Sequence, residues 1–167
     1  IVTERIAAGR WTVAAQERFG RQLAGLHLSG SECFGLAHDN FIATLAQSNA
    51  PTPTWPQFLA QRRIVPLTRA AVGLPARLRR DLDLLADRLP HLCGPAEPPA
   101  RLHGDLWSGN VVPAASGSAV LIDPAVVGGH REVDLAMMRL FGGFPPRVFD
   151  AYDEVAPLAA GHWERVA

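Results

Sequence analysis

The sequence contains no lysine, and all 16 of its basic residues are arginine. No apolar run approaches the roughly 18 residues of a transmembrane helix, and no signal peptide opens the chain, so we expect no membrane association. Sixteen acidic residues balance the arginines, which leaves no electrostatic case for binding nucleic acid. Cys33 and Cys93 lack metal or redox spacing. We therefore expect two reduced thiols in a cytoplasmic protein, a disulfide between them being the alternative.

The most informative segment is the stretch Arg101–Asn110, which reads R-L-H-G-D-L-W-S-G-N. Asn110 follows Asp105 by five positions, and Asp123 comes after the hairpin-like segment 111–122. This order matches the protein-kinase architecture, in which an H-x-D…N loop precedes a metal-binding turn. Phosphoryl transfer depends on positioning and on charge stabilisation. We therefore predict that Asp105 orients the attacking hydroxyl, and that Asn110 and Asp123 hold Mg²⁺ against ATP.

Two other interpretations of these residues stay open. A Gly-Asp pair followed by Asn also forms ordinary turns, but apolar strands at Leu102 and 120–122 favour carboxylates at the mouths of neighbouring strands. Alternatively, His103, Asp105 and Asp123 could bind the metal of a phosphohydrolase. Their spacing matches the kinase loop better, and no His-rich cluster accompanies them.

These motifs resemble the fructosamine (ketosamine) kinase family of the aminoglycoside-phosphotransferase-like kinases. The resemblance includes L-I-D-P-A-V, G-H-R-E-V-D-L-A-M and the earlier F-G-L-A-H-D-N-F-I, and it covers nearly the whole chain. It implies Mg-ATP-dependent phosphorylation of the 3-hydroxyl of a small-molecule or protein-bound ketosamine, which is a deglycation repair reaction. Trp107 and Ser108 favour this acceptor over an aminoglycoside or another small alcohol. The segment 127–129 departs from the family, because aromatic residues are expected there.

The resemblance implies an α+β, predominantly α-helical fold: the carboxyl-terminal lobe of a protein-kinase-like architecture, with a small β-hairpin at the catalytic loop. Kinases of this kind hold ATP phosphates with a strand lysine beneath a Gly-rich loop, and the 167 residues contain neither. Arginine is a poor substitute for that compact ammonium. We therefore expect the chain to lack the amino-terminal lobe and the last helices. Alone it would be inactive, and a non-catalytic binding module is the alternative.

The interlobe hinge is predicted at residues 1–9. A short strand over residues 1–6 would present backbone groups to the adenine, with Glu4, Arg5 and Ile6 as the contact residues. A plain edge strand without a ligand is the alternative.

Apolar periodicity predicts four helices. They begin after the N-cap Thr12, after the T-x-x-Q capping box at Thr54, near Pro75, and at Asp134, the last ending at Gly142 and Gly143. His27 would satisfy the carboxyl terminus of the first helix. Trp55 and Phe58 are expected in the core. The intervening segment 29–49, rich in Gly, Ser, Asn and Asp, is predicted to be a long surface loop.

Residues around the catalytic stretch supply weaker candidates for contacts with the substrate. Besides Trp107, they are His38, Asp39, Asn40, His130, Arg131 and Glu132. An Asx turn at residues 39 and 40 and an ion pair between residues 131 and 132 are the structural alternatives. Asp134 is predicted to anchor the catalytic loop together with His103, or to act as a helix N-cap.

Overall fold

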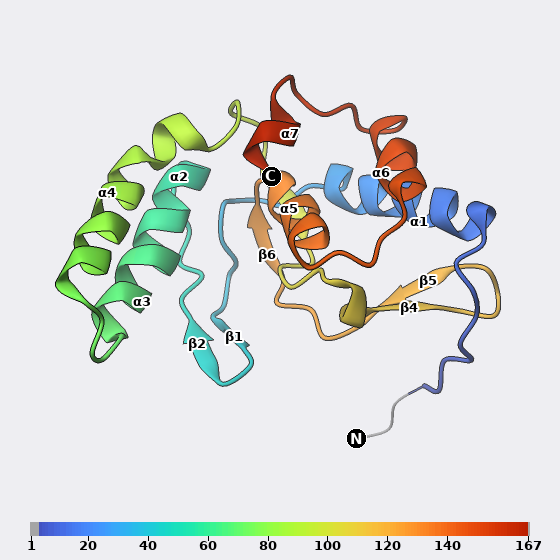
Figure 1. The fold of residues 1–167 in the computed structure, drawn as a ribbon, viewed down its shortest axis with the longest axis horizontal. Coiled ribbons are helices and arrows are strands. Elements are labelled where there is room, and N and C mark those ends of the chain that lie inside the picture. Colours follow the sequence, from blue (N-terminus) through green and yellow to red (C-terminus); the bar gives the residue numbers. More distant parts are fainter. Residues whose placement is uncertain (1–3, 167) are drawn as a thin grey trace.

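The computed structural model describes residues 4–166 and shows an α+β fold in which helices predominate (Figure 1). The helices are α1 (Val13–Leu28), α2 (Trp55–Phe58), α3 (Val65–Ala70), α4 (Ala76–Leu92), α5 (Glu132–Phe141), α6 (Pro146–Asp153) and α7 (His162–Arg165). The strands are β1 (Asn40–Ile42), β2 (Leu45–Gln47), β3 (Ala100–Leu102), β4 (Val111–Pro113), β5 (Ala119–Leu121) and β6 (Val127–Gly129). A π-helical segment (Leu59–Ile64) joins α2 to α3, and a 3₁₀ turn (Ser108–Asn110) precedes β4.

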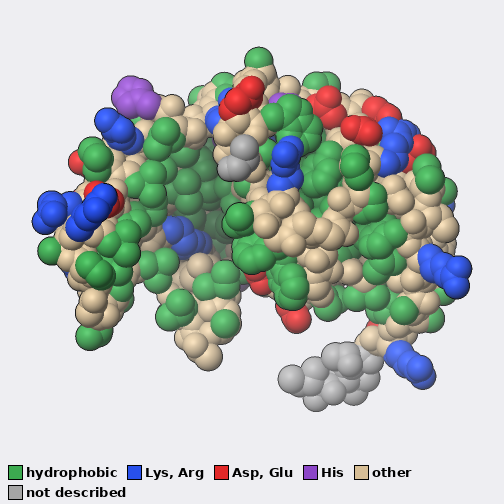
Figure 2. All heavy atoms as spheres, viewed as in Figure 1, with side chains coloured by type: hydrophobic (Ala, Val, Ile, Leu, Met, Phe, Trp, Pro, Cys, Tyr) green, Lys and Arg blue, Asp and Glu red, His purple; other side chains and the backbone are tan. Residues whose placement is uncertain are grey.

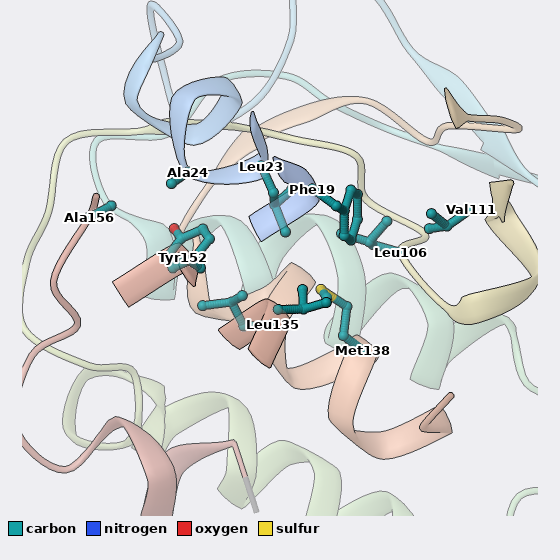
Figure 3. Packing of buried hydrophobic residues seen from close by; sticks show 10 residues of the cluster. Phe19, Leu23, Ala24, Leu106, Val111, Leu135, Met138, Tyr152 and Ala156 are labelled. Carbon is teal, nitrogen blue, oxygen red and sulfur yellow. The ribbon is translucent and has the colours of Figure 1, made fainter. Parts of the chain in front are cut away.

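The larger hydrophobic core lies between α1, α5 and α6 (Figure 3). Thr12 caps α1 as predicted, because its hydroxyl accepts a hydrogen bond from the Ala15 N–H at 3.2 Å. Phe19 and Leu23, four residues apart, share the buried face of that helix. A Cβ on Gly20 would lie 2.2 Å from the Val148 carbonyl oxygen, so glycine allows α1 and α6 to pack closely. The segment 101–110 joins this core through the fully buried Leu106.

The second hydrophobic core joins α2 to the β3–β6 pair. Trp55 and Phe58 are buried and stacked, with ring centroids 5.4 Å apart, which confirms their predicted place in the core. They pack with Ala100, Leu102 and Val127. The predicted N-cap Thr54 accepts a hydrogen bond from the Gln57 N–H at 3.4 Å. Through β3, this core reaches the residue that precedes His103.

The helix α4 confirms the prediction near Pro75, but its leucines are less buried than their spacing indicates. Leu89 is buried, whereas Leu78 and Leu85 are 44% and 37% exposed. The helix packs on α2, α3 and the π-helical segment, and its other side faces solvent. Between α4 and α5 the surface is hollowed and lined mainly by apolar side chains, with a cavity of about 190 Å³ (Figure 2).

Three predictions of strand and loop structure were wrong. Residues 4–7 have no regular structure; residues 1–3 of the predicted strand lie outside the described residues. The chain instead bridges to the hairpin turn at Ala8 and Ala114. The predicted loop 29–49 contains the antiparallel pair β1–β2. Finally, β3 pairs with β6 and β4 with β5, so the strands before the two carboxylates are not neighbours in one sheet.

Within residues 4–166, no helix is both long enough and apolar enough to cross a membrane. Cys33 and Cys93 are not joined by a disulfide in the described part of the chain.

Candidate functional site

The first turn of α5 holds the backbone of the predicted catalytic loop at residues 103 and 104. Asp134 is fully buried, and its carboxylate accepts hydrogen bonds from the His103 N–H at 2.8 Å and the Gly104 N–H at 3.0 Å. Gly104 has φ +82°, and a Cβ there would lie 2.0 Å from the Ala125 carbonyl oxygen. Glycine is therefore required where the loop passes between α5 and the segment after Asp123.

Asp105 and Asn110 are hydrogen-bonded to each other inside the loop. The Asn110 amide nitrogen donates to the Asp105 carbonyl oxygen at 2.8 Å and to its carboxylate Oδ2 at 3.0 Å. Asn110 is buried at the end of the 3₁₀ turn, whereas Asp105 is partly open to solvent. Leu106, which follows Asp105 in the sequence, is fully buried in the larger core. The loop is therefore held by this apolar contact as well as by the hydrogen bonds between Asp105 and Asn110.

Asp123 lies in a second turn that is tied to the first. The Ile122 N–H donates to the Asn110 carbonyl oxygen at 3.0 Å, and the His103 Nε2 donates to the Ile122 carbonyl oxygen at 3.0 Å. The other ring nitrogen of His103 accepts from the Asp105 N–H at 3.3 Å, which fixes the tautomer. Asp123 itself is exposed and has φ +50°, a strained conformation for a residue with a side chain.

The side chains of Asn110 and Asp123 suit Mg²⁺, which prefers oxygen ligands and is held in such sites by few protein groups plus phosphate oxygens. With its nitrogen turned to Asp105, Asn110 keeps its amide oxygen for a metal ion. Within residues 4–166, no group of three or more His, Cys, Asp or Glu side chains could hold a metal ion. Both ring nitrogens of His103 are also engaged. The donor set therefore fits a phosphate-bound Mg²⁺ better than the metal of a phosphohydrolase.

Trp107 lies two residues after Asp105 and is 42% exposed. Its ring covers Gly109, where a Cβ would lie 2.2 Å from the nearest ring carbon. Glycine at that position thus leaves room for the indole over the loop.

The upstream candidates form long-range contacts, so the Asx-turn alternative was wrong. The Asp39 carboxylate accepts from the Asn49 N–H at 2.8 Å, and the Asn49 amide donates to the His38 carbonyl oxygen at 3.2 Å. The Asn40 amide donates to the Val126 carbonyl oxygen at 2.9 Å. Strand β1 therefore lies beside the segment that follows Asp123.

The downstream candidates are engaged elsewhere, and the predicted ion pair between Arg131 and Glu132 was wrong. Arg131 makes two hydrogen bonds of 2.8 Å to the carboxylate of Glu97, and Glu132 pairs with Arg165. Burial opposes ionisation of Glu97, but Arg131 outweighs it and lowers the pKa of this carboxyl. His130 bonds to the Pro95 carbonyl oxygen at 3.2 Å. These are structural contacts, and a substrate role for the three residues stays a prediction.

The antiparallel β3–β6 register explains the distance of these residues from the loop. It pairs Leu102 with Val127 and Ala100 with Gly129. His103 therefore leaves the ladder at one end and His130 at the other.

The departure at residues 127–129 has a packing reason. A Cβ on Gly128 would lie 2.0 Å from the Cys33 carbonyl oxygen, and one on Gly129 would lie 2.6 Å from Leu102. Gly128 and Gly35 also exchange two backbone hydrogen bonds, of 2.8 and 2.9 Å. The segment before β1 therefore occupies the space that an aromatic side chain at position 128 would need.

His27 was assigned wrongly from the sequence. It does not serve the end of α1 with its side chain but is buried, with Nδ1 2.8 Å from the Tyr152 hydroxyl and Nε2 3.1 Å from the Asp134 carboxylate. Its position four residues after Leu23, on the buried face of α1, was a usable signal. Tyr152 offered no comparable signal, because its contact is 125 residues away along the chain.

Comparison with known proteins shows which proteins this chain resembles in sequence and in fold. The family model for fructosamine kinase matches residues 1–167. The chain is 37% identical to the probable ketoamine kinase of Synechocystis sp., over 99% of this chain and 56% of the relative, and 41% identical to that of Thermus thermophilus, over 85% and 52%. A crystal structure from Thermobifida fusca, named provisionally as a fructosamine-3-kinase, superposes with a TM-score of 0.91 at 49% identity, over 98% of this chain and 58% of that one. The chain thus spans about half the length of the curated relatives it matches.

Proposed function

Because the chain belongs to the fructosamine kinase family, we propose that the protein transfers the γ-phosphoryl group of Mg-ATP to the 3-hydroxyl of a ketosamine. Its fold would correspond to the carboxyl-terminal lobe of a protein-kinase-like architecture. The product, a ketosamine 3-phosphate, would decompose and release the amine, so the biological role would be deglycation repair.

The observation that carries this proposal is the linkage of two carboxylate turns into one unit. Asp134 holds the backbone on the amino-terminal side of Asp105, and Asn110 holds its carboxylate. Ile122 then connects Asn110 and His103 to the turn of Asp123. A transfer reaction that gains most from positioning needs such a fixed pair of carboxylates.

We assign Asp105 to the acceptor hydroxyl and Asn110 and Asp123 to the metal. The hydroxyl oxygen forms a bond to the γ-phosphorus, the bond from that phosphorus to the bridging oxygen of ADP breaks, and the hydroxyl proton passes to the Asp105 carboxylate. Bound Mg²⁺ would neutralise charge on the phosphate oxygens during this transfer. Trp107, which is 42% exposed and two residues after Asp105 in the sequence, would supply a flat apolar surface for the acceptor.

The test is the substitution Asp105→Asn in the protein expressed from its complete gene. We expect ATP binding to stay unchanged and phosphorylation of a fructosamine to fall about 10²- to 10⁴-fold, the usual contribution of a positioned base. Asp83→Asn, the same change at an exposed position of α4, serves as the control. Transfer at the parent rate in the Asp105 variant would refute the assignment. If an aminoglycoside is phosphorylated faster than a fructosamine, the proposed acceptor is wrong, but the proposed roles of Asp105, Asn110 and Asp123 in phosphoryl transfer stand.

A further inference from the structure

A buried chain of hydrogen bonds leads from α6 to the catalytic loop. The Tyr152 hydroxyl lies 2.8 Å from His27 Nδ1, and His27 Nε2 lies 3.1 Å from Asp134 Oδ2. Tyr152 is fully buried and reaches from α6 towards α1 within the larger core (Figure 3). The side chains of His27 and Asp134 are 0% and 1% exposed. Water therefore cannot replace any of these contacts.

The chemistry of the three groups fixes the direction of each hydrogen bond. A carboxylate accepts but does not donate, so His27 must donate its Nε2–H to Asp134. In the neutral ring, Nδ1 then accepts, and the donor is the Tyr152 hydroxyl. Burial raises the pKa of Tyr152 to about 12, although nearby Arg131 opposes the shift, so the phenol keeps its proton at neutral pH. Asp134 thereby fixes the Nε2–H tautomer of His27, and Tyr152 holds the ring from its other side by donating to Nδ1.

Asp134 depends on this donor for its orientation. Its Oδ2 receives both the His27 Nε2–H and the His103 N–H, while Oδ1 receives the Gly104 N–H. Rotation of the carboxylate would break all three bonds at once. The His27 ring, held by Tyr152, therefore holds the Asp134 carboxylate, which in turn holds the two backbone amides of the loop.

We infer that His27 and Tyr152 are positioning residues, which fix Asp134 and, through the His103 and Gly104 amides, the place of Asp105. Neither residue touches the reacting atoms. The effect on catalysis rests on the proposed function, whereas the effect on the loop backbone does not.

The test uses Tyr152→Phe in the protein expressed from its complete gene, because this change removes the hydroxyl and keeps the aromatic ring in the core. Thr52→Val is the matched control: it removes another buried hydroxyl, which donates to the Thr54 carbonyl oxygen at 3.0 Å, just before α2. Native-state hydrogen exchange at His103 and Gly104 and the ¹⁵N shifts of the His27 ring are measured in both variants.

In Tyr152→Phe, we expect exchange at the His103 and Gly104 amides to accelerate about two- to tenfold relative to the control, the equivalent of one net hydrogen bond. The ¹⁵N shift of His27 Nδ1 should change because this nitrogen loses its hydrogen-bond donor, while Nε2 stays protonated towards Asp134. If the protein is a ketosamine kinase, kcat should fall by a similar factor with the KM for ATP unchanged.

Unchanged exchange at both amides in Tyr152→Phe would overturn the inference, even if kcat falls. So would a parent spectrum in which both His27 nitrogens are protonated. Faster exchange in a protein that shows no kinase activity would leave the inference standing and refute the proposed function instead.

Discussion

Replacing Gly128 with alanine should destabilise the protein far more than a single methyl group normally does. Residue 128 sits in the middle of β6, and a Cβ there would lie 2.0 Å from the Cys33 carbonyl oxygen and 2.9 Å from the Ser31 Cβ. The nearest obstacle is backbone, which cannot rotate away as a side chain can. The segment 31–36 would have to move off the strand.

The size of the effect follows from what that movement breaks. Gly128 and Gly35 exchange two backbone hydrogen bonds, and each contributes about 1 kcal/mol net. Overpacking of a tight contact adds about 1–3 kcal/mol. The free energy of unfolding should therefore fall by about 3–5 kcal/mol. At about 2–4 °C per kcal/mol for a protein of this size, the melting temperature should fall by roughly 6–20 °C.

Gly25→Ala is the matched control, because it adds the same methyl group where no atom lies within 4 Å. Gly25 lies inside α1, where alanine is favoured by about 0.5–1 kcal/mol. Gly128→Ala should thus lower the free energy of unfolding, whereas Gly25→Ala should raise it. Urea unfolding followed through tryptophan fluorescence measures both changes. A Gly128 variant within about 1 kcal/mol of the parent would show that segment 31–36 yields easily, and the packing account of β6 would be wrong.

Two smaller effects test other local contacts. Thr12→Ala should lower the free energy of unfolding by about 1 kcal/mol, because the N-cap of α1 is lost; a melting temperature equal to that of the parent would contradict this. The pKa of Glu97 is lowered in the folded protein, despite its burial, because of its pair with Arg131. The pair therefore stabilises the protein at pH values above 4.5, the ordinary pKa of this carboxyl, and this stability is lost as the pH falls through the folded pKa. Glu97→Gln should therefore lose less stability than the parent between about pH 5 and pH 3. If the urea midpoint of the variant falls with decreasing pH as much as that of the parent, the pair does not contribute as argued.

The sequence signals that succeeded are local ones. Thr12 and Thr54 mark helix starts through a side chain that bonds a backbone N–H three residues on. The spacing of Trp55 and Phe58 places both on one face of a helix, and both are buried. Such features depend on a few adjacent residues, so the composition of a short window is enough to predict them.

The predictions that failed depend on contacts between distant residues. β3 and β6 contain three residues each, too few to show an alternating pattern, and their pairing joins positions 25 to 29 residues apart. The hairpin at 40–47 was hidden in a segment whose composition is typical of loops. His27 was misassigned because its partners, Tyr152 and Asp134, lie more than a hundred residues away.

The two carboxylate turns show why the candidate site could be located from spacing while its construction could not. Both turns need a left-handed backbone: at Gly104 glycine adopts it freely, but at position 123 the chain uses aspartate with φ +50°. Aspartate tolerates this region better than most residues, yet glycine would be less strained. Retaining a strained carboxylate there is consistent with a need for its charge rather than for the turn. The hydrogen bonds of His103 and Asn110 to Ile122, directly before Asp123, compensate for that strain and connect it to the loop of Asp105. Displacement of Ile122 would therefore move Asp123 and loosen the contacts around Asp105 together, although Ile122 has no polar side chain of its own.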